Sequence, residues 1–262
     1  MIKLLSIEWL KIRHYATFWI LAGLLGVFIC LMNIGVRYGI MNVGKSQVSI
    51  LSNIYSFPGV WDNVAFWTKF FTALISIIII ILTTNEYMFR TNRQNIIDGW
   101  TRMQFLHSKW LIVIVLSLFV TCYTFIEGMV FAIANGSSLS NFAGHIEKIF
   151  YVFVLCMNYF GLALTLSLFF KRSGMTIIIF LMYNYIIEVL LMKLINTHTT
   201  GDYGNFLPLQ CSADLISFPF TEMIKKALNA SAPSNQSLLI ASIFWIVIYY
   251  LVTRLRLMKT DW

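Results

Sequence analysis

Charged residues are scarce in this sequence. Only 11% of its 262 residues are Asp, Glu, Lys or Arg, whereas 59% are hydrophobic. Soluble domains carry about 25% charged residues, so this composition excludes a water-soluble globular protein. The hydrophobic residues lie in long runs, as a chain that crosses a lipid bilayer requires. The sequence therefore predicts an integral membrane protein.

Cysteine and histidine are also sparse, with four of each. Three of the cysteines fall in apolar runs and only Cys211 lies in a predicted loop, so neither a disulfide framework nor a metal site is expected. The histidines are scattered without the spacing of a zinc site, and no catalytic grouping is recognisable. We therefore expect a non-catalytic chain with no metal and no cofactor of its own.

Six apolar segments approach the length of about 20 residues that spans a bilayer core of about 30 Å. We place them at about 18–36, 67–84, 110–133, 149–170, 175–195 and 238–255. No internal repeat or second unit interrupts this series. The prediction is a single all-α transmembrane domain over residues 1–262.

The formal net charge is +8. The basic residues gather beside the apolar segments and form no continuous basic face, which argues against nucleic-acid binding. If both termini are cytoplasmic, most of the 19 Lys and Arg residues fall on the cytoplasmic side, as the positive-inside rule requires. We therefore expect a multi-pass protein of the cell (inner) membrane with its N-terminus and C-terminus in the cytoplasm.

Residues 2–14 have the spacing of an amphipathic helix. The apolar face comprises Ile2, Leu5, Trp9 and Ile12, and the opposite face comprises Lys3, Lys11 and His14. This pattern favours a helix that lies in the membrane interface. A plain flank of the first span is the alternative, and it gives the same topology.

The connector at 85–109 is the most polar stretch in the first half of the chain. Its basic residues outnumber its acidic ones, which places it in the cytoplasm. Residues 86–97 contain no Gly or Pro and are predicted to form a short helix that Asp98-Gly99 ends. A second helix is expected to begin at Trp100 and to continue into the third span. An ordinary positive-inside loop remains the alternative.

The connector resembles that of ABC-2 permeases, the membrane subunits of type V ABC transporters. The residues that carry the resemblance are Glu86, Arg90, Thr91, Arg93, Ile96, Ile97, Gly99, Trp100, Arg102, Phe105 and Lys109. The helix at 2–14 is similar to the elbow helix that opens those permeases. The resemblance implies six transmembrane helices, an elbow helix and a cytoplasmic coupling helix that docks on a separate ATPase.

The resemblance also implies a function. The chain would be the permease subunit of an ATP-driven exporter, with ATP and Mg bound by two copies of a partner ATPase. A second permease subunit would complete a homodimer or heterodimer in contact with membrane lipids. The implied coupling residues are Glu86, Arg90, Thr91, Arg93, Trp100 and Arg102, with Trp100 at headgroup level. A non-transporting anchor or sensor that binds a partner through 85–109 is the alternative.

Two acidic residues, Glu127 and Glu188, fall in the predicted third and fifth spans. Acidic side chains inside a membrane usually face the bundle interior or water. Each is compatible with a substrate contact, a proton-sensitive site or an ion pair with Lys148 or Lys193. An ordinary carboxylate that reaches the headgroup layer is the remaining alternative.

Two further stretches lie on the predicted outer side. Residues 39–46 match the phosphate-binding pattern G-x-x-x-x-G-K-[ST], which works only between a buried strand and a helix. Here the pattern directly follows a membrane span, so we expect no nucleotide there. The apolar run at 215–228 is expected to form a re-entrant or interfacial helical piece before the last span.

Overall fold

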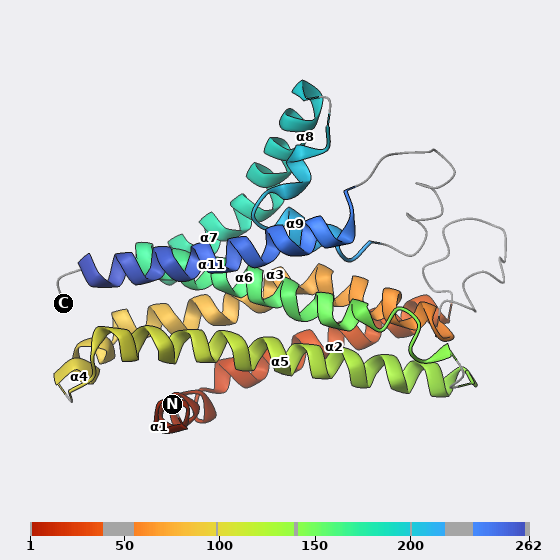
Figure 1. Cartoon of the computed structure of the whole chain (residues 1–262). Helices are drawn as coiled ribbons and strands as arrows, with labels where there is room; N and C mark the ends of the chain where they lie inside the picture. The colour runs from red at the N-terminus through yellow and green to blue at the C-terminus, as the bar shows by residue number, and fades with distance from the viewer. Residues whose placement is uncertain are drawn as a thin grey trace.

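The computed structural model of the chain is an elongated bundle of helices (Figure 1). It describes residues 2–38, 55–97, 99–138, 141–199, 201–217 and 233–259. In chain order the helices are α1 (Ile2–Arg13), α2 (Ala16–Arg37), α3 (Gly59–Met88), α4 (Thr91–Ile97), α5 (Arg102–Ala134), α6 (Glu147–Phe170), α7 (Ser173–Met182), η3 (Tyr183–Ile187), α8 (Glu188–His198), η4 (Tyr203–Phe206), α9 (Gln210–Asp214) and α11 (Asn235–Lys259). Within these ranges there is no strand, so the all-α prediction is confirmed.

Six helical stretches are long and apolar enough to cross a membrane, as predicted. They are α2, α3, α5, α6, α11 and the continuous run of α7, η3 and α8, in which η3 is a π-helical turn. Each predicted span lies inside one of these stretches, but several helices are longer than their apolar run. The start of α3 shows why: Asp62, Asn63 and Lys69 reduce the local hydropathy there, yet partners on other segments satisfy all three side chains.

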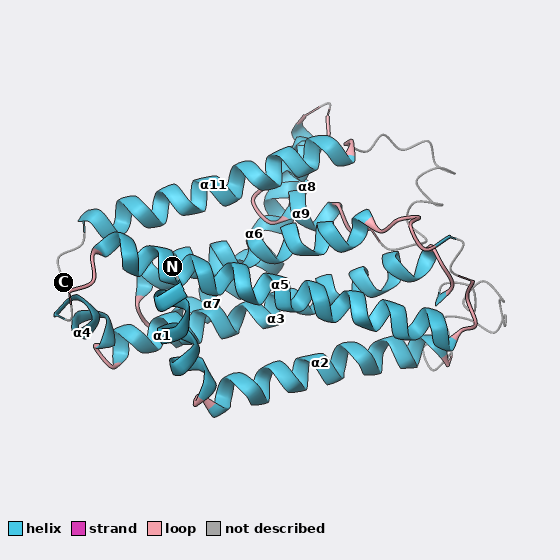
Figure 2. Cartoon of the chain, turned by 60° about the horizontal axis from the view of Figure 1, so that its bottom comes forward, coloured by secondary structure: helices cyan, strands magenta, loops and turns pink. Residues whose placement is uncertain are grey.

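The centre of the bundle is the pair α3 and α6, which pack against each other along their lengths. Helix α2 packs on α3, α11 packs on α6, and α5 packs on both, so α2 and α11 lie at opposite edges (Figure 2). Close approach around α6 depends on Gly161, because a Cβ there would lie 3.2 Å from the rings of both Trp110 and Tyr249. Small residues commonly permit such helix contacts in membranes.

Both termini and α4 lie at one end of the bundle, which we call the α4 end (Figure 1). Helix α1 crosses the bundle direction at this end (Figure 2). At the opposite end, here called the far end, the chain leaves α2 toward α3. The phosphate-pattern residues 39–46 lie outside the described residues. Residues 218–228 of the predicted re-entrant run do so as well.

Candidate functional site

The α4 end is built by two sharp turns around a short helix. Helix α3 ends at Met88, and Arg90 adopts a left-handed conformation with φ of 57° that turns the chain into α4. Gly99, with φ of 91°, follows the end of α4, and Thr101 then caps α5 by accepting a hydrogen bond from the Gln104 N–H. The end of the predicted connector helix is confirmed by the bounds of α4.

The predicted start of that helix is wrong. Glu86 belongs to the last turn of α3, and α4 begins only at Thr91. The expected second helix begins at Arg102 and not at Trp100. The physical reason is that Glu86 has buried partners on neighbouring helices, so α3 continues beyond its apolar run before the chain turns.

Large apolar side chains are exposed around α4. Phe89, directly before the left-handed Arg90, is 69% exposed, and Ile97 at the end of α4 is 83% exposed. The side chains of Arg90 and Gln94 are also exposed. The segment from Phe89 to the end of α4 therefore presents an apolar and basic surface beyond the last turn of α3 and the first turn of α5.

Four charged residues from three helices meet just beneath α4. Lys109 Nζ of α5 lies 2.9 Å from Glu8 Oε1 of α1 and 2.6 Å from Glu86 Oε1 of α3. Lys11 Nζ of α1 lies 2.9 Å from the same Glu86 oxygen and 3.5 Å from Glu8 Oε1. We call Glu8, Lys11, Glu86 and Lys109 the four-charge cluster. It ties the elbow helix to both helices that flank α4.

Burial makes the four-charge cluster sensitive to the loss of any member. The side chains of Glu8, Glu86 and Lys109 are 3%, 8% and 2% exposed. Burial by itself raises the pKa of the Glu8 carboxyl, but the nearby charges of Lys109 and Lys11 outweigh it and lower that pKa below its ordinary value. With two carboxylates and two ammonium groups, the cluster is balanced in charge.

The four-charge cluster changes the expected surroundings of Lys11. The sequence pattern predicts Lys11 in water, on the face of α1 opposite Trp9 and Ile12. In the structure Lys11 pairs with Glu86 and is 31% exposed, while Trp9 is 50% exposed and Ile12 is buried. The side chains of Ile2, Lys3 and Leu5 lie outside the described residues. Periodicity does not foresee the pairing of Lys11, because it counts Lys and Glu as solvent-facing residues.

The other predicted coupling residues have different surroundings. Trp100 is partly buried, with Lys11 Nζ 5.9 Å from its ring centroid. Arg102 is exposed and donates to the Met258 carbonyl oxygen of α11 at 2.7 Å, a favourable position for a cation at a helix C-terminus. Thr91 Oγ1 donates to the Glu86 carbonyl oxygen at 3.4 Å. The side chain of Arg93 lies outside the described residues.

Glu188 binds a buried helix end. Its Oε1 accepts hydrogen bonds from the backbone N–H groups of Leu209 and Gln210, at 2.6 and 2.9 Å, at the start of α9. At the other end of α9, Lys69 Nζ donates to the carbonyl oxygens of Ala213 and Ile216. A carboxylate at the N-terminus and an ammonium group at the C-terminus both complement the helix dipole. Glu188 thus helps to hold α9 against the bundle.

Glu127 has a neutral partner. Its Oε1 accepts from Asn33 Nδ2 of α2 at 2.9 Å, and Asn33 also contacts the Tyr55 hydroxyl and Asn63. Glu127 is 6% exposed, and its Oε2 has no hydrogen-bond partner within the described residues. Of the two lysines considered as partners for the intramembrane carboxylates, Lys148 lies 3.7 Å from Asp62 instead.

Sequence reasoning missed Glu8, Lys69 and the pair of Asp62 and Lys148 as structural residues. A signal was available for two of these: Glu8 is the one acidic residue in the first 14 residues, and Lys69 stands inside a long apolar stretch. A charge in such a position requires a partner. Which partner it finds depends on helix packing and cannot be read from spacing.

Comparison with known families agrees with the fold. Residues 4–187 match the family described as ABC-2 family transporter protein. A search of curated proteins gave no match. The match covers more than half of the chain, so the protein belongs to the ABC-2 transporter family. It is a multi-pass membrane subunit of an ABC transporter, and the family implies an ABC ATPase as its partner.

Proposed function

We propose that this chain is the permease subunit of an ATP-driven exporter in the cell (inner) membrane. Helix α4 is its coupling helix, which docks on a separate ATPase that binds ATP and Mg. The working unit contains two permease subunits, alike or different, and two ATPase subunits. Both chain termini and α4 face the cytoplasm.

The observation that carries this proposal is the exposed surface at α4. Phe89 and Ile97 are 69% and 83% exposed at an end of the bundle that lies beyond the membrane-spanning stretches. Large apolar side chains exposed to water commonly mark protein interfaces. The exposed Arg90 adds a cation that suits an acidic groove on a partner.

The four-charge cluster supports a coupling role for α4. Glu86 and Lys109 join the end of α3 to the start of α5, and Glu8 and Lys11 add the elbow helix α1. A push on α4 by the partner is therefore delivered to three helices together. Rigid displacement of packed helices is an established way to transmit a conformational change.

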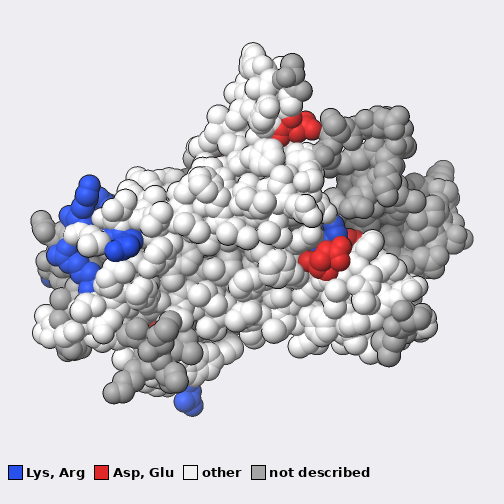
Figure 3. All heavy atoms as spheres, in the orientation of Figure 1, with Lys and Arg blue, Asp and Glu red and all other residues white. Residues whose placement is uncertain are grey.

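The distribution of charge supports the orientation. Figure 3 shows that the Lys and Arg side chains on the visible face gather at the α4 end, whereas the visible Asp and Glu lie mainly toward the far end. Short segments rich in Lys and Arg stay on the cytoplasmic side. A cysteine placed at the exposed Gln94 should therefore resist a membrane-impermeant maleimide in intact cells and react after the cells are opened. Labelling in intact cells would overturn the orientation.

Coupling is tested by co-purifying this chain with its ABC ATPase partner in lipid nanodiscs. Phe89→Ala and Arg90→Glu should each weaken binding of the ATPase by about 2 kcal/mol and reduce the stimulation of ATP hydrolysis. The matched control is Arg13→Glu, an exposed position on α1 at the same end. If the proteins co-purify and the ATPase rate never depends on this subunit, the chain is a non-transporting anchor or sensor.

A further inference from the structure

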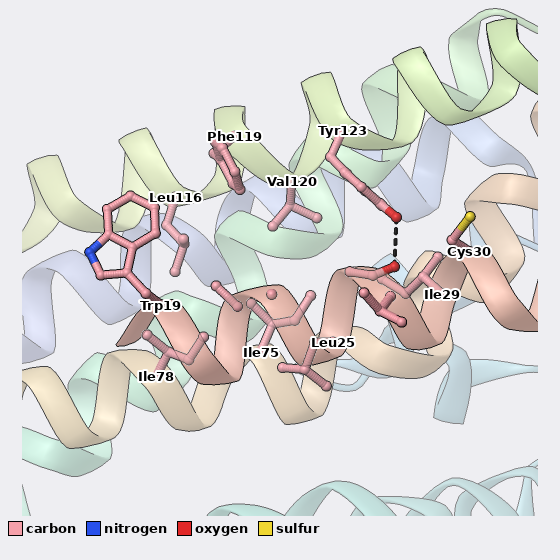
Figure 4. Close-up of a pocket in the computed structure, with 14 residues that line it drawn as sticks. Trp19, Leu25, Ile29, Cys30, Ile75, Ile78, Leu116, Phe119, Val120 and Tyr123 are labelled. Carbon is pink, nitrogen blue, oxygen red and sulfur yellow. Dashed lines mark hydrogen bonds between the residues drawn. The ribbon is translucent and has the colours of Figure 1, made fainter. Parts of the chain in front are cut away.

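A groove runs between α2 and α5 on one side of the bundle. Both helices pack on α3 and make few close approaches to each other. The space between them, about 390 Å³, has a floor of Ile75 and Ile78 from α3, and Trp19 and Phe119 lie along its sides (Figure 4). Its lining is almost entirely apolar, so an occupant of this part must be hydrocarbon-like.

A second hollow continues the groove toward the far end. It also measures about 390 Å³ and shares Cys30 and Tyr123 with the first. Between the two, the Tyr123 hydroxyl of α5 donates to the Gly26 carbonyl oxygen of α2 at 2.6 Å (Figure 4). The Tyr123 hydroxyl therefore has its partner within the protein. The groove stays apolar up to Glu127.

Glu127 lines the second hollow. It is 6% exposed, and its Oε2 has no hydrogen-bond partner among the described residues. Glu127 lies seven residues before the end of α5 at Ala134, or about 10 Å along the helix. A carboxylate at such a depth needs a counter-charge or hydrogen-bond donors.

No cation in the described residues forms an ion pair with Glu127. Arg37 lines the same hollow, but its guanidinium donates to the Ala134 carbonyl oxygen at 2.7 Å. The only donor to the Glu127 carboxylate within the described part of the chain is the neutral amide of Asn33. The hollow thus combines an apolar extension with a carboxylate that lacks a cationic partner.

We propose that the groove between α2 and α5 binds an amphiphile that carries an ammonium group, with its hydrocarbon part along α2 and its ammonium group at Glu127. An ammonium group supplies the counter-charge that the Glu127 carboxylate lacks among the described residues. The ligand enters from the membrane, because the groove lies along two spanning helices. This binding requires no ATPase, so it stands or falls separately from the proposed coupling function.

The test compares two probes that differ only in their head: nitroxide-labelled octadecylamine and the matching nitroxide-labelled octadecanol. Each is added to the full chain in phosphatidylcholine nanodiscs at pH 7.5, and the immobilised fraction of probe is measured by electron paramagnetic resonance. The wild-type protein should prefer the amine by about tenfold, as expected for a charge-assisted hydrogen bond. Equal immobilisation of the two probes would overturn the proposal.

Two variants separate the head site from the groove. Glu127→Gln keeps an acceptor for Asn33 and should abolish the preference for the amine while the alcohol still binds. Gly23→Phe should reduce binding of both probes several-fold, because Gly23 lines the groove and a Cβ added there would have no neighbouring atom within 4 Å. Thermal unfolding of both variants confirms that they are folded.

Gly35→Phe is the control for the groove variant. Gly35 lies on the same helix with equally open surroundings, but it lines neither hollow. Its substitution should leave both probes unchanged. An unaltered amine preference in Glu127→Gln, or equal effects of Gly23→Phe and Gly35→Phe, would show that the probes bind as ordinary surrounding lipid.

Discussion

The two ends of the bundle hold their buried carboxylates in different ways. At the α4 end, Glu8 and Glu86 contact the ammonium groups of Lys11 and Lys109 at distances from 2.6 to 3.5 Å. Toward the far end, Glu127 has only the amide of Asn33. Each site leaves one buried oxygen, Glu86 Oε2 or Glu127 Oε2, without a hydrogen-bond partner among the described residues. The two sites therefore differ in counter-charge and share only this one oxygen without a partner.

This difference teaches what each site is suited to do. Paired charges hold one geometry, since separating them exposes each to an apolar interior, and the four-charge cluster accordingly fixes α1 against α3 and α5. A carboxylate that lacks a cationic partner in the chain can bind a cation from outside the chain. Glu188 is a third case, in which two backbone N–H groups of α9 take the place of a cation.

The largest effect is expected from Lys109→Met, which removes the ammonium group that lies between Glu8 and Glu86. Two buried carboxylates then share only Lys11, so the free energy of unfolding should fall by about 3–5 kcal/mol. Thermal unfolding in nanodiscs measures this loss. Lys11→Met is the matched control and should cost less, because the Lys11 side chain is 31% exposed. Equal losses would show that the cluster does not depend on Lys109.

A smaller effect is expected from Asn33→Leu at the far end. The substitution removes the donor to Glu127 and the side-chain contacts with Tyr55 and Asn63, and should cost about 1–3 kcal/mol of stability. The double variant Asn33→Leu with Glu127→Leu should recover part of that loss, since no carboxylate is then left without a donor. A double variant that is less stable than Asn33→Leu would contradict this account of the site.

The smallest effect is expected from pH in the neutral range. The pKa of Glu8 is lowered below its ordinary value of 4.5, so its contribution to stability is complete above that value and is lost as pH falls through the lowered pKa. The difference in unfolding temperature between wild type and Glu8→Gln should stay constant from about pH 8 to 6 and shrink under acid conditions. A difference that shrinks on the alkaline side instead would contradict the ionised cluster.

Parts of the candidate site were predictable, and others were not. The sequence predicted that the connector helix ends before Gly99, because glycine tolerates a left-handed conformation. The exposure of Arg90 agrees with its predicted place in a polar connector. The burial of Glu86 did not follow, because its partners Lys11 and Lys109 come from helices 75 and 23 residues away. The sequence did not predict that Phe89 is exposed, since apolar residues beside a membrane span are expected to be buried.

The sequence by itself determined that this chain crosses a membrane with six helices, because burial of so many apolar residues and so few charges is possible only in lipid. It also determined where the polar connector lies between the second and third spans. Only the tertiary structure decided which charges pair and which stay open. Pairing depends on helix rotation and depth, which place Lys109 between Glu8 and Glu86 but, among the described residues, bring only the Asn33 amide to Glu127.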